Sequence, residues 1–282
     1  MQTAPLTVRA PDGRVLAGTS SGPTDGRPVL FVAGAGTGRA MTFGDDLLAA
    51  RSVRLITMDR PGMGGSDPDP ARTVASTAAD YRTFLSGVLG GDHAAVPVVA
   101  NSQGALFGLA LAAHGWPSTL VLVSPADEVA HPDVRALLPQ AARTLPDLVA
   151  GDPGRARAVL HSFTAEGMRT MILDSSIPAD RAVYTEPAFA RRWATALDQG
   201  FAHNGAGYVV DTMAAMAPWP LDLARIACPT VVLYGAEDAG HSPDLCVLLA
   251  SRILGSRRIV VPGAGGALLW THADRVLDLA LS

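Results

Sequence analysis

Lysine is absent from this sequence of 282 residues, so every one of its 22 basic residues is an arginine. This absence excludes a Schiff base on lysine and a lysine general base. Cysteine is nearly as scarce. The two cysteines, Cys228 and Cys246, form neither a disulfide framework nor a metal-binding spacing. Their apolar surroundings predict buried thiols, and we expect no metal and no cofactor.

Charge is also sparse. Charged residues make up 17% of the chain and the net charge is −4. Because no cluster of basic residues occurs, we expect no nucleic acid as partner. No apolar stretch approaches the length of a membrane span, and residues 1–10 lack the apolar core of a signal peptide. We therefore expect a cytoplasmic protein, with no membrane partner, that acts on a small molecule. The oligomeric state stays open.

Hydrophobic residues are abundant, at 48%, which suffices for a large core. Short apolar segments alternate with helix-like segments, and a polar turn at residues 11–13 predicts an antiparallel hairpin before them. This alternation predicts an α/β fold with a mostly parallel central sheet flanked by helices. The expected strands are Pro28–Ala33, Val53–Met58, Val96–Ala100, Thr119–Val123, Pro229–Tyr234 and Arg257–Val261, and the last two expected helices are Ser242–Leu254 and Ala267–Leu281.

The alternation breaks down between residues 126 and 227, where helix-like segments are interrupted by prolines. We predict that residues 1–125 and 228–282 form an α/β core and that residues 126–227 form a helical cap. The cap is rich in large apolar side chains, which either line a substrate pocket or form the cap's own core. These residues are Met168, Met171, Ile172, Phe189, Trp193, Phe201, Tyr208, Met213, Met216 and Trp219.

The segment Ala100-Asn101-Ser102-Gln103-Gly104 joins an expected buried strand to an expected helix. A serine between strand and helix, with small residues two before and two after, is typical of a nucleophile elbow. Such a turn would expose Ser102 and leave the Gln103 N–H at a helix N-terminus, where it can stabilise an oxyanion. The alternative is an ordinary loop with a helix-capping serine.

Two further loops follow expected strands. The turn Gly34-Ala35-Gly36-Thr37-Gly38 lacks the spacing of a dinucleotide-binding loop, and we expect the Ala35 N–H to be the second oxyanion donor. The turn Gly235-Ala236-Glu237-Asp238 places an acid after a later strand. Because carboxyl ends of parallel strands meet at one edge of a sheet, these loops are expected to lie near Ser102.

Together these motifs resemble the α/β-hydrolase superfamily over nearly the whole chain. The resemblance rests on the 34–38 turn, Asp59-Arg60-Pro61-Gly62-Met63-Gly64-Gly65-Ser66, the Ser102 elbow and the Asp238 turn. It implies that Ser102 is the nucleophile and that Asp238 orients a histidine base. The family places this histidine in the loop after the last strand. Here that loop reads Pro262-Gly263-Ala264-Gly265-Gly266, so that Gly266 stands at the histidine position.

The sequence has seven histidines that could replace this base. His241 is the best candidate because it follows Asp238 by three residues on the same loop, although it could instead serve packing at a helix start. His272 is the next candidate. The others are expected in surface loops (His93, His114) or within the cap (His131, His161, His203). Asp127 and Glu128 offer a second source of an acid.

Two functions follow from these residues. The first is hydrolysis of an ester, thioester or lactone-like carbonyl in a small to medium apolar substrate, through Ser102, Asp238 and His241. A serine needs a general base because its hydroxyl is a weak nucleophile at neutral pH. The alternative is a non-hydrolytic cyclase, lyase or ligand-binding protein that keeps the pocket and oxyanion hole but has no working triad.

Overall fold

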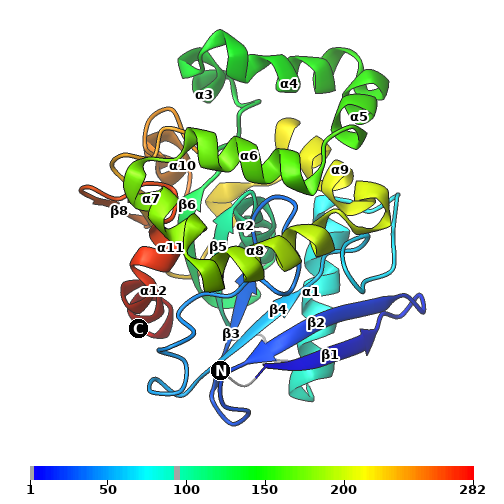
Figure 1. The fold of residues 1–282 in the computed structure, drawn as a ribbon, viewed down its shortest axis with the longest axis vertical. Helices are drawn as coiled ribbons and strands as arrows, with labels where there is room; N and C mark the ends of the chain where they lie inside the picture. Colours follow the sequence, from blue (N-terminus) through cyan, green and yellow to red (C-terminus); the bar gives the residue numbers. More distant parts are fainter. Residues whose placement is uncertain (1–2, 92–95) are drawn as a thin grey trace.

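The computed structural model describes residues 3–91 and 96–282, and its centre is an eight-stranded sheet (Figure 1). The strand order is β1-β2-β4-β3-β5-β6-β7-β8. The first two strands pair antiparallel, β2 also runs antiparallel to β4, and all other pairs are parallel. The strands are β1 (Thr3–Arg9), β2 (Val15–Ser21), β3 (Arg27–Val32), β4 (Val53–Met58), β5 (Val96–Ser102), β6 (Pro117–Pro125), β7 (Thr230–Gly235) and β8 (Arg257–Val261).

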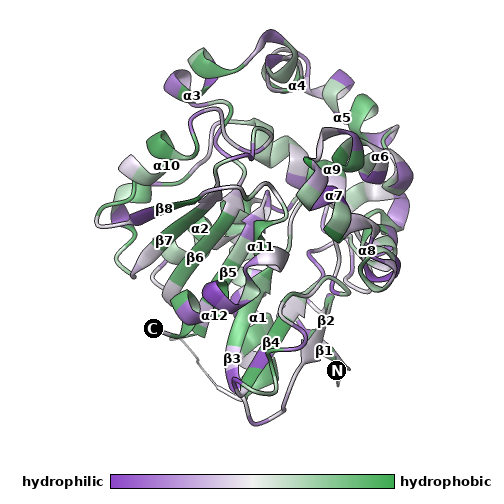
Figure 2. Cartoon of the chain, turned by 60° about the vertical axis from the view of Figure 1, so that its left-hand side comes forward, coloured by the Kyte–Doolittle hydropathy of each residue, from purple (hydrophilic) through white to green (hydrophobic). Residues whose placement is uncertain are grey.

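Helices cover both faces of the sheet, which explains why the central strands are apolar at consecutive positions. In β5, Val99 packs into the core on one face, whereas Val98 and Ala100 pack into the core on the other. Helices α1 (Val74–Leu89) and α2 (Gly104–Ala113) cover one face, and α11 (Leu268–Thr271) and α12 (Ala273–Leu281) cover the other (Figure 2). The predicted α/β fold with a mostly parallel sheet is confirmed.

Seven α-helices and a short 3-10 helix (Leu223–Arg225) lie between β6 and β7, within the stretch predicted as a cap. Several of its prolines begin helices rather than break them, because proline fits the first helical turn, where no N–H partner is needed. The α-helices are α3 (Pro132–Leu137), α4 (Gln140–Gly151), α5 (Pro153–His161), α6 (Ala165–Ser175), α7 (Pro178–Thr185), α8 (Pro187–Gly200) and α9 (Ala202–Met216). In Figure 1 α3 to α6 lie at the top of the molecule, whereas α8 lies at mid-height.

Two of the expected helices are shorter than the sequence predicts. The segment expected to be helical over Ser242–Leu254 contains only α10 (Val247–Ser251), because Leu245 and Cys246 adopt left-handed backbone angles. The Ser242 hydroxyl accepts the Cys246 N–H there, which competes with regular helix bonding. The last expected helix is divided at His272 into α11 and α12. Among the residues described, no helix is both long and apolar enough to span a membrane.

Candidate functional site

The turn between β5 and α2 holds Ser102 in a left-handed backbone conformation, with φ of +52°. Small neighbours make this turn possible. A Cβ at Gly104 would lie 2.4 Å from the carbonyl oxygen of Val32. Ala100, which stands where a glycine is more usual, fits because its methyl group lies against Gly108 of α2, where a Cβ would approach it to 2.7 Å. The elbow geometry thus depends on glycines at 104 and 108.

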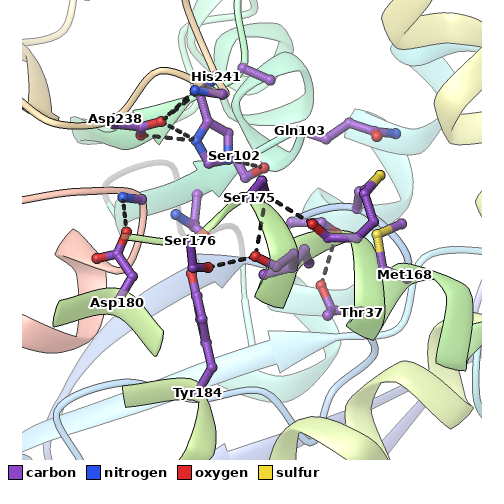
Figure 3. A pocket seen from close by; sticks show the side chains of 18 of the residues that line it. Thr37, Ser102, Gln103, Met168, Ser175, Ser176, Asp180, Tyr184, Asp238 and His241 are labelled. Carbon is purple, nitrogen blue, oxygen red and sulfur yellow. Dashed lines mark hydrogen bonds and ion pairs between the residues drawn. The ribbon is translucent and has the colours of Figure 1, made fainter. Parts of the chain in front are cut away.

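A chain of hydrogen bonds links Ser102, His241 and Asp238 (Figure 3). Nε2 of His241 lies 3.0 Å from Oγ of Ser102. Nδ1 of the same ring lies 2.9 Å from Oδ2 and 3.0 Å from Oδ1 of Asp238. Since a carboxylate only accepts hydrogen bonds, it favours the tautomer with the proton on Nδ1, which leaves Nε2 to accept the serine proton.

The loop that carries His241 is fixed by its own hydrogen bonds. The Gly240 N–H donates to Oδ1 of Asp238 at 3.1 Å. The buried Tyr234 hydroxyl accepts the Ser242 N–H at 2.8 Å and donates to the main-chain oxygen of Asp238 at 3.1 Å. The two ends of the turn are therefore tied to one side chain of β7, and the imidazole between them has a defined position.

Gly266 provides the space that the imidazole occupies. A Cβ at this position would lie 3.3 Å from Cε1 of His241 and 3.7 Å from Oδ2 of Asp238. Gly266 does not adopt a left-handed conformation, so its backbone places no demand for glycine. The glycine is explained by space: a side chain at 266 would begin in tight contact with the ring of His241.

The two ionisable partners affect each other's charge. Burial raises the pKa of the Asp238 carboxyl, but the adjacent His241 outweighs this effect and holds that pKa below its ordinary value. Burial likewise opposes a positive charge on His241, yet the carboxylates of Asp238 and Asp180 hold the imidazole pKa above its ordinary value. The site therefore favours an aspartate anion beside a readily protonated imidazole.

The two expected oxyanion donors border the same cavity as Ser102. Ala35 follows the end of β3, and Gln103 is the residue before α2. Within residues 3–91 and 96–282, no hydrogen bond occupies the main-chain N–H of either residue. The Arg60 guanidinium donates to the carbonyl oxygens of Ala33 and Gly34 at 2.8 Å each, which fixes the turn that presents Ala35.

The other candidate bases lie away from Ser102. His272 begins α12, and its Nδ1 contacts the Thr271 hydroxyl. His114, His131, His161 and His203 each contact main-chain atoms elsewhere. His93 lies outside the described residues.

The second pair of acids has structural partners instead. The Asp127 carboxylate accepts the Ser242 hydroxyl at 2.8 Å. Glu128 accepts the Trp219 N–H at 2.7 Å and pairs with Arg252. These contacts tie the loop after β6 to its neighbours.

A cavity of about 550 Å³ opens above Ser102, between the sheet edge and the helices of residues 126–227. Six of the ten predicted ceiling residues line it: Met168, Met171, Ile172, Trp193, Tyr208 and Met216. The other four, Phe189, Phe201, Met213 and Trp219, are not among its lining residues. Some of the large apolar side chains of residues 126–227 therefore line the cavity, and the others pack elsewhere.

Sequence reasoning missed several cavity residues, including Asp180, Tyr184 and Trp270. Asp180 is buried and its carboxylate accepts the Gly266 N–H at 2.8 Å. Only the fold brings α7 to the loop after β8, so no local pattern marks this acid. Among the described residues, no group of three or more His, Cys, Asp or Glu side chains is placed to hold a metal ion.

Comparison with solved structures supports the fold. A hydrolase from Pseudomonas aeruginosa is 23% identical, with a TM-score of 0.69 over 98% of this chain and 96% of that one. A thermophilic esterase from Thermogutta terrifontis is 21% identical (TM-score 0.63; 99% and 96% covered). The enol-lactonase from Burkholderia xenovorans is 19% identical (TM-score 0.66; 96% and 98% covered).

Sequence comparison adds the family. A search of curated proteins finds no match. The model of the alpha/beta hydrolase family, however, matches residues 29–279, which is most of the chain. The match spans the Ser102 elbow, the Asp238 turn and the loop that carries Gly266. On this evidence the chain belongs to the alpha/beta hydrolase family.

Proposed function

We propose that this protein is a serine hydrolase that cleaves an ester, thioester or lactone-like carbonyl of a small to medium apolar substrate. Ser102 is the nucleophile, His241 the general base, and Asp238 the acid that orients it. One observation carries the proposal: His241 bridges Ser102 and Asp238 with hydrogen bonds of 3.0 and 2.9 Å. A catalytic triad is identified by such geometry and not by chain order.

In the first step, Oγ of Ser102 attacks the substrate carbonyl carbon while Nε2 of His241 takes the hydroxyl proton. The carbonyl oxygen becomes an oxyanion, which the N–H groups of Ala35 and Gln103 stabilise. Asp238 stabilises the imidazolium that forms. The bond to the leaving group then breaks, and His241 returns its proton to the leaving oxygen or sulfur. The products of an ester or thioester are a free alcohol or thiol and an acyl group on Ser102, whereas a lactone opens to a hydroxyacyl group on Ser102 and releases nothing at this step.

In the second step, His241 takes a proton from water, and the resulting hydroxide equivalent attacks the acyl carbon. The second oxyanion forms in the same place. When it collapses, the bond to Oγ breaks and His241 returns the proton to Ser102. The acid product leaves, and the enzyme regains its starting protonation state.

We infer that residues 126–227 act as a cap that shapes the substrate site. Its helices supply methionine and aromatic side chains to a cavity that also contains Ser102. A volume of about 550 Å³ lies within the range of small-molecule sites. The lining is mainly apolar, which supports an apolar acyl or alcohol group in the substrate.

The test is covalent labelling by a fluorophosphonate probe, followed by intact mass, on the wild type and on Ser102→Ala and His241→Ala. We expect one adduct on the wild type, none on Ser102→Ala, and labelling of His241→Ala slowed by roughly 10³-fold or more, because loss of the base removes most of the activation of a serine. His272→Ala is the matched control, since it removes a histidine that does not contact Ser102, and it should label at the wild-type rate.

Each contrary outcome has a definite meaning. A wild type that stays unlabelled contradicts the hydrolase proposal and favours the non-hydrolytic alternative. Rapid labelling of His241→Ala contradicts the assignment of the base. Slow labelling of His272→Ala with normal labelling of His241→Ala would move the base to His272, between α11 and α12.

A further inference from the structure

We propose that Asp180 is a second carboxylate that positions the catalytic imidazole and supports its charge, acting through the loop at Gly266. The inference rests on the proposed function, because it assigns a role relative to His241 as base. Asp180 belongs to α7, one of the helices between β6 and β7. It lines the cavity with Ser102 and His241 but contacts neither the nucleophile nor the ring through a hydrogen bond.

The first observation is the contact between Asp180 and the loop after β8. Oδ2 of Asp180 accepts the Gly266 N–H at 2.8 Å, as Figure 3 shows. The fit is close: a Cβ at Gly265 would lie 2.1 Å from Oδ2. Asp180 is 5% exposed, so this hydrogen bond is largely protected from water. Burial raises the pKa of the Asp180 carboxyl, and the Gly266 N–H opposes that rise.

The second observation is the position of Gly266 between Asp180 and the imidazole. Its N–H donates to Asp180, and a Cβ on the same residue would lie 3.3 Å from Cε1 of His241. A displacement of the loop toward the ring would therefore press on the imidazole. By holding the Gly266 N–H, Asp180 fixes the loop that borders the space of His241.

The third observation is the balance of charge around the ring. Asp238 faces Nδ1 from the loop of His241, Asp180 approaches from α7, and the exposed Glu237 lies at the cavity edge. Tyr184 of α7 lines the same cavity and is neutral, because burial raises its pKa above the ordinary value. No arginine is among the cavity-lining residues that the structure describes.

These charges act on His241 in one direction. Burial works against a positive ring, whereas Asp238 and then Asp180 raise the imidazole pKa. The carboxylate of Asp180 therefore stabilises the imidazolium that forms when Ser102 attacks. Its effect is electrostatic as well as steric, which separates this role from that of a purely structural side chain.

The experiment compares Asp180→Asn and Asp180→Ala with the wild type in a pH profile of kcat and kcat/KM on a neutral ester. Asparagine keeps an oxygen that can accept the Gly266 N–H but removes the charge. We expect its acidic limb of kcat/KM to move to lower pH and its plateau kcat to fall several-fold, with little change in KM. Alanine removes both contributions, so we expect a larger fall in kcat.

Glu237→Gln is the matched control, because it removes a charge of the same sign from the exposed edge of the cavity. Water screens that charge, so its profile should stay close to the wild type. The ring itself is followed independently by NMR titration of His241 in the wild type and in Asp180→Asn, which does not depend on turnover. The imidazole pKa should be lower in Asp180→Asn.

The inference is overturned if Asp180→Asn keeps the wild-type acidic limb and imidazole pKa, or if Glu237→Gln moves both equally far. A separate result identifies failure of the proposed function. If the fluorophosphonate does not label wild-type Ser102, the role of His241 as base fails and the role of Asp180 fails with it. Labelled wild type with an unchanged Asp180→Asn profile rejects the role of Asp180 alone.

Discussion

At the scale of single residues, the main feature of this site is the loop from which its histidine comes. His241 comes from the loop after β7, which also carries Asp238, so the acid and the proposed base share one short turn. The two side chains can meet because Gly240 and the Tyr234 hydroxyl fix that turn. A catalytic group needs a particular position for its atoms, and different parts of a fold can supply it.

The first prediction concerns pH. The proposed base His241 can accept a proton only when its ring is neutral, and its pKa is raised above the ordinary value of about 6.5 by Asp238 and Asp180 against the effect of burial. Activity should therefore rise with pH, with an acidic limb of kcat/KM centred above about 6.5. The check is a profile from pH 5 to 9 on a neutral ester. A limb centred below pH 6 would contradict this electrostatic description.

The second prediction concerns Gly266. A methyl group at this position would press on Cε1 of His241, which lies 3.3 Å from the Cβ site. Since a small displacement of a catalytic group can cost up to about 10²-fold in rate, we expect Gly266→Ala to lower kcat substantially with little loss of folding stability. Kinetics and thermal unfolding check the two parts of this expectation.

Gly240→Ala is the control for Gly266→Ala. Its Cβ would lie 3.8 Å from Oδ1 of Asp238, which is an ordinary contact, and its backbone is not left-handed. It also keeps the N–H that donates to Asp238. Its activity should stay near that of the wild type. Equal loss in both variants would mean that any added bulk near this loop is harmful, and that Gly266 has no special role.

The third prediction moves the histidine to the position where the family places it. The Cβ site at 266 lies 3.7 Å from Oδ2 of Asp238, so an imidazole that starts there can approach the same carboxylate. We expect the double variant His241→Ala with Gly266→His to be at least about ten-fold more active than His241→Ala alone. This ratio corresponds to about 1.4 kcal/mol of activation free energy. Gly266→His alone should lose activity, because two rings would compete for one space.

Hydrolysis of a neutral ester by the three variants measures this recovery. If the double variant is no more active than His241→Ala, a histidine at position 266 cannot replace the histidine at position 241. Fluorophosphonate labelling of all three variants separates loss of the base from loss of the folded site. Labelling remains measurable where turnover is too slow.

The sequence allowed prediction of the serine, the acid and the histidine as neighbours, because each follows a strand end and parallel strand ends share one edge. It did not predict Asp180. That residue lies in α7 between the exposed Ala179 and Arg181, and its contact with Gly266 spans 86 positions along the chain. A contact of this kind depends on how the helices pack over the sheet, which periodicity does not specify.

At the scale of elements, a buried ion-pair group joins three parts of the fold. Arg60, after β4, donates to the carbonyl oxygens that end β3 and to Asp211 of α9. Arg72, before α1, also pairs with Asp211. Asp59, the residue before Arg60, lies outside this group and pairs with Arg39.

The fourth prediction follows from this burial. Asp211 and Arg60 are almost fully buried, and removing one partner leaves the other charge without compensation. We expect Asp211→Ala to lower the free energy of unfolding by about 3–5 kcal/mol. Urea unfolding followed by far-UV circular dichroism gives this value.

Asp278→Ala is its control, because that carboxylate pairs with Arg51 at the exposed surface. Exposed pairs contribute little to stability, so the unfolding midpoint should not change. A midpoint for Asp211→Ala that also matches the wild type would show that the buried group is not needed for the stability of the fold.

At the scale of the whole molecule, the order of elements was predictable, whereas the cavity was not. Apolar runs in the sequence predict the buried strands, and the alternation of these strands with helices determines the architecture. The cavity depends on which faces of seven helices turn inward. Phe189 and Trp193 occupy one helix four positions apart, yet only Trp193 lines the cavity. Sequence patterns gave the same expectation for both.

The last prediction concerns the charge of the substrate. Among the described residues, the cavity lining includes the buried Asp180 and Asp238 but no arginine, and the sequence has no lysine. A carboxylate in the substrate would enter an apolar space that faces acids of the same sign, which is costly. We expect kcat/KM for a neutral straight-chain ester to exceed that for an ester of equal length ending in a carboxylate by at least about ten-fold.

A cation placed at the cavity should reduce this preference. Met171 lines the cavity and is 50% exposed, so Met171→Arg should raise the relative kcat/KM of the anionic ester. Val247→Arg adds the same charge at a residue that is 47% exposed but is not part of the lining, and it should leave the ratio unchanged. If the wild type hydrolyses both esters equally well, the acids of the cavity do not select the substrate. If Val247→Arg alters the ratio as much as Met171→Arg, the net charge of the molecule sets the preference, and the cavity does not.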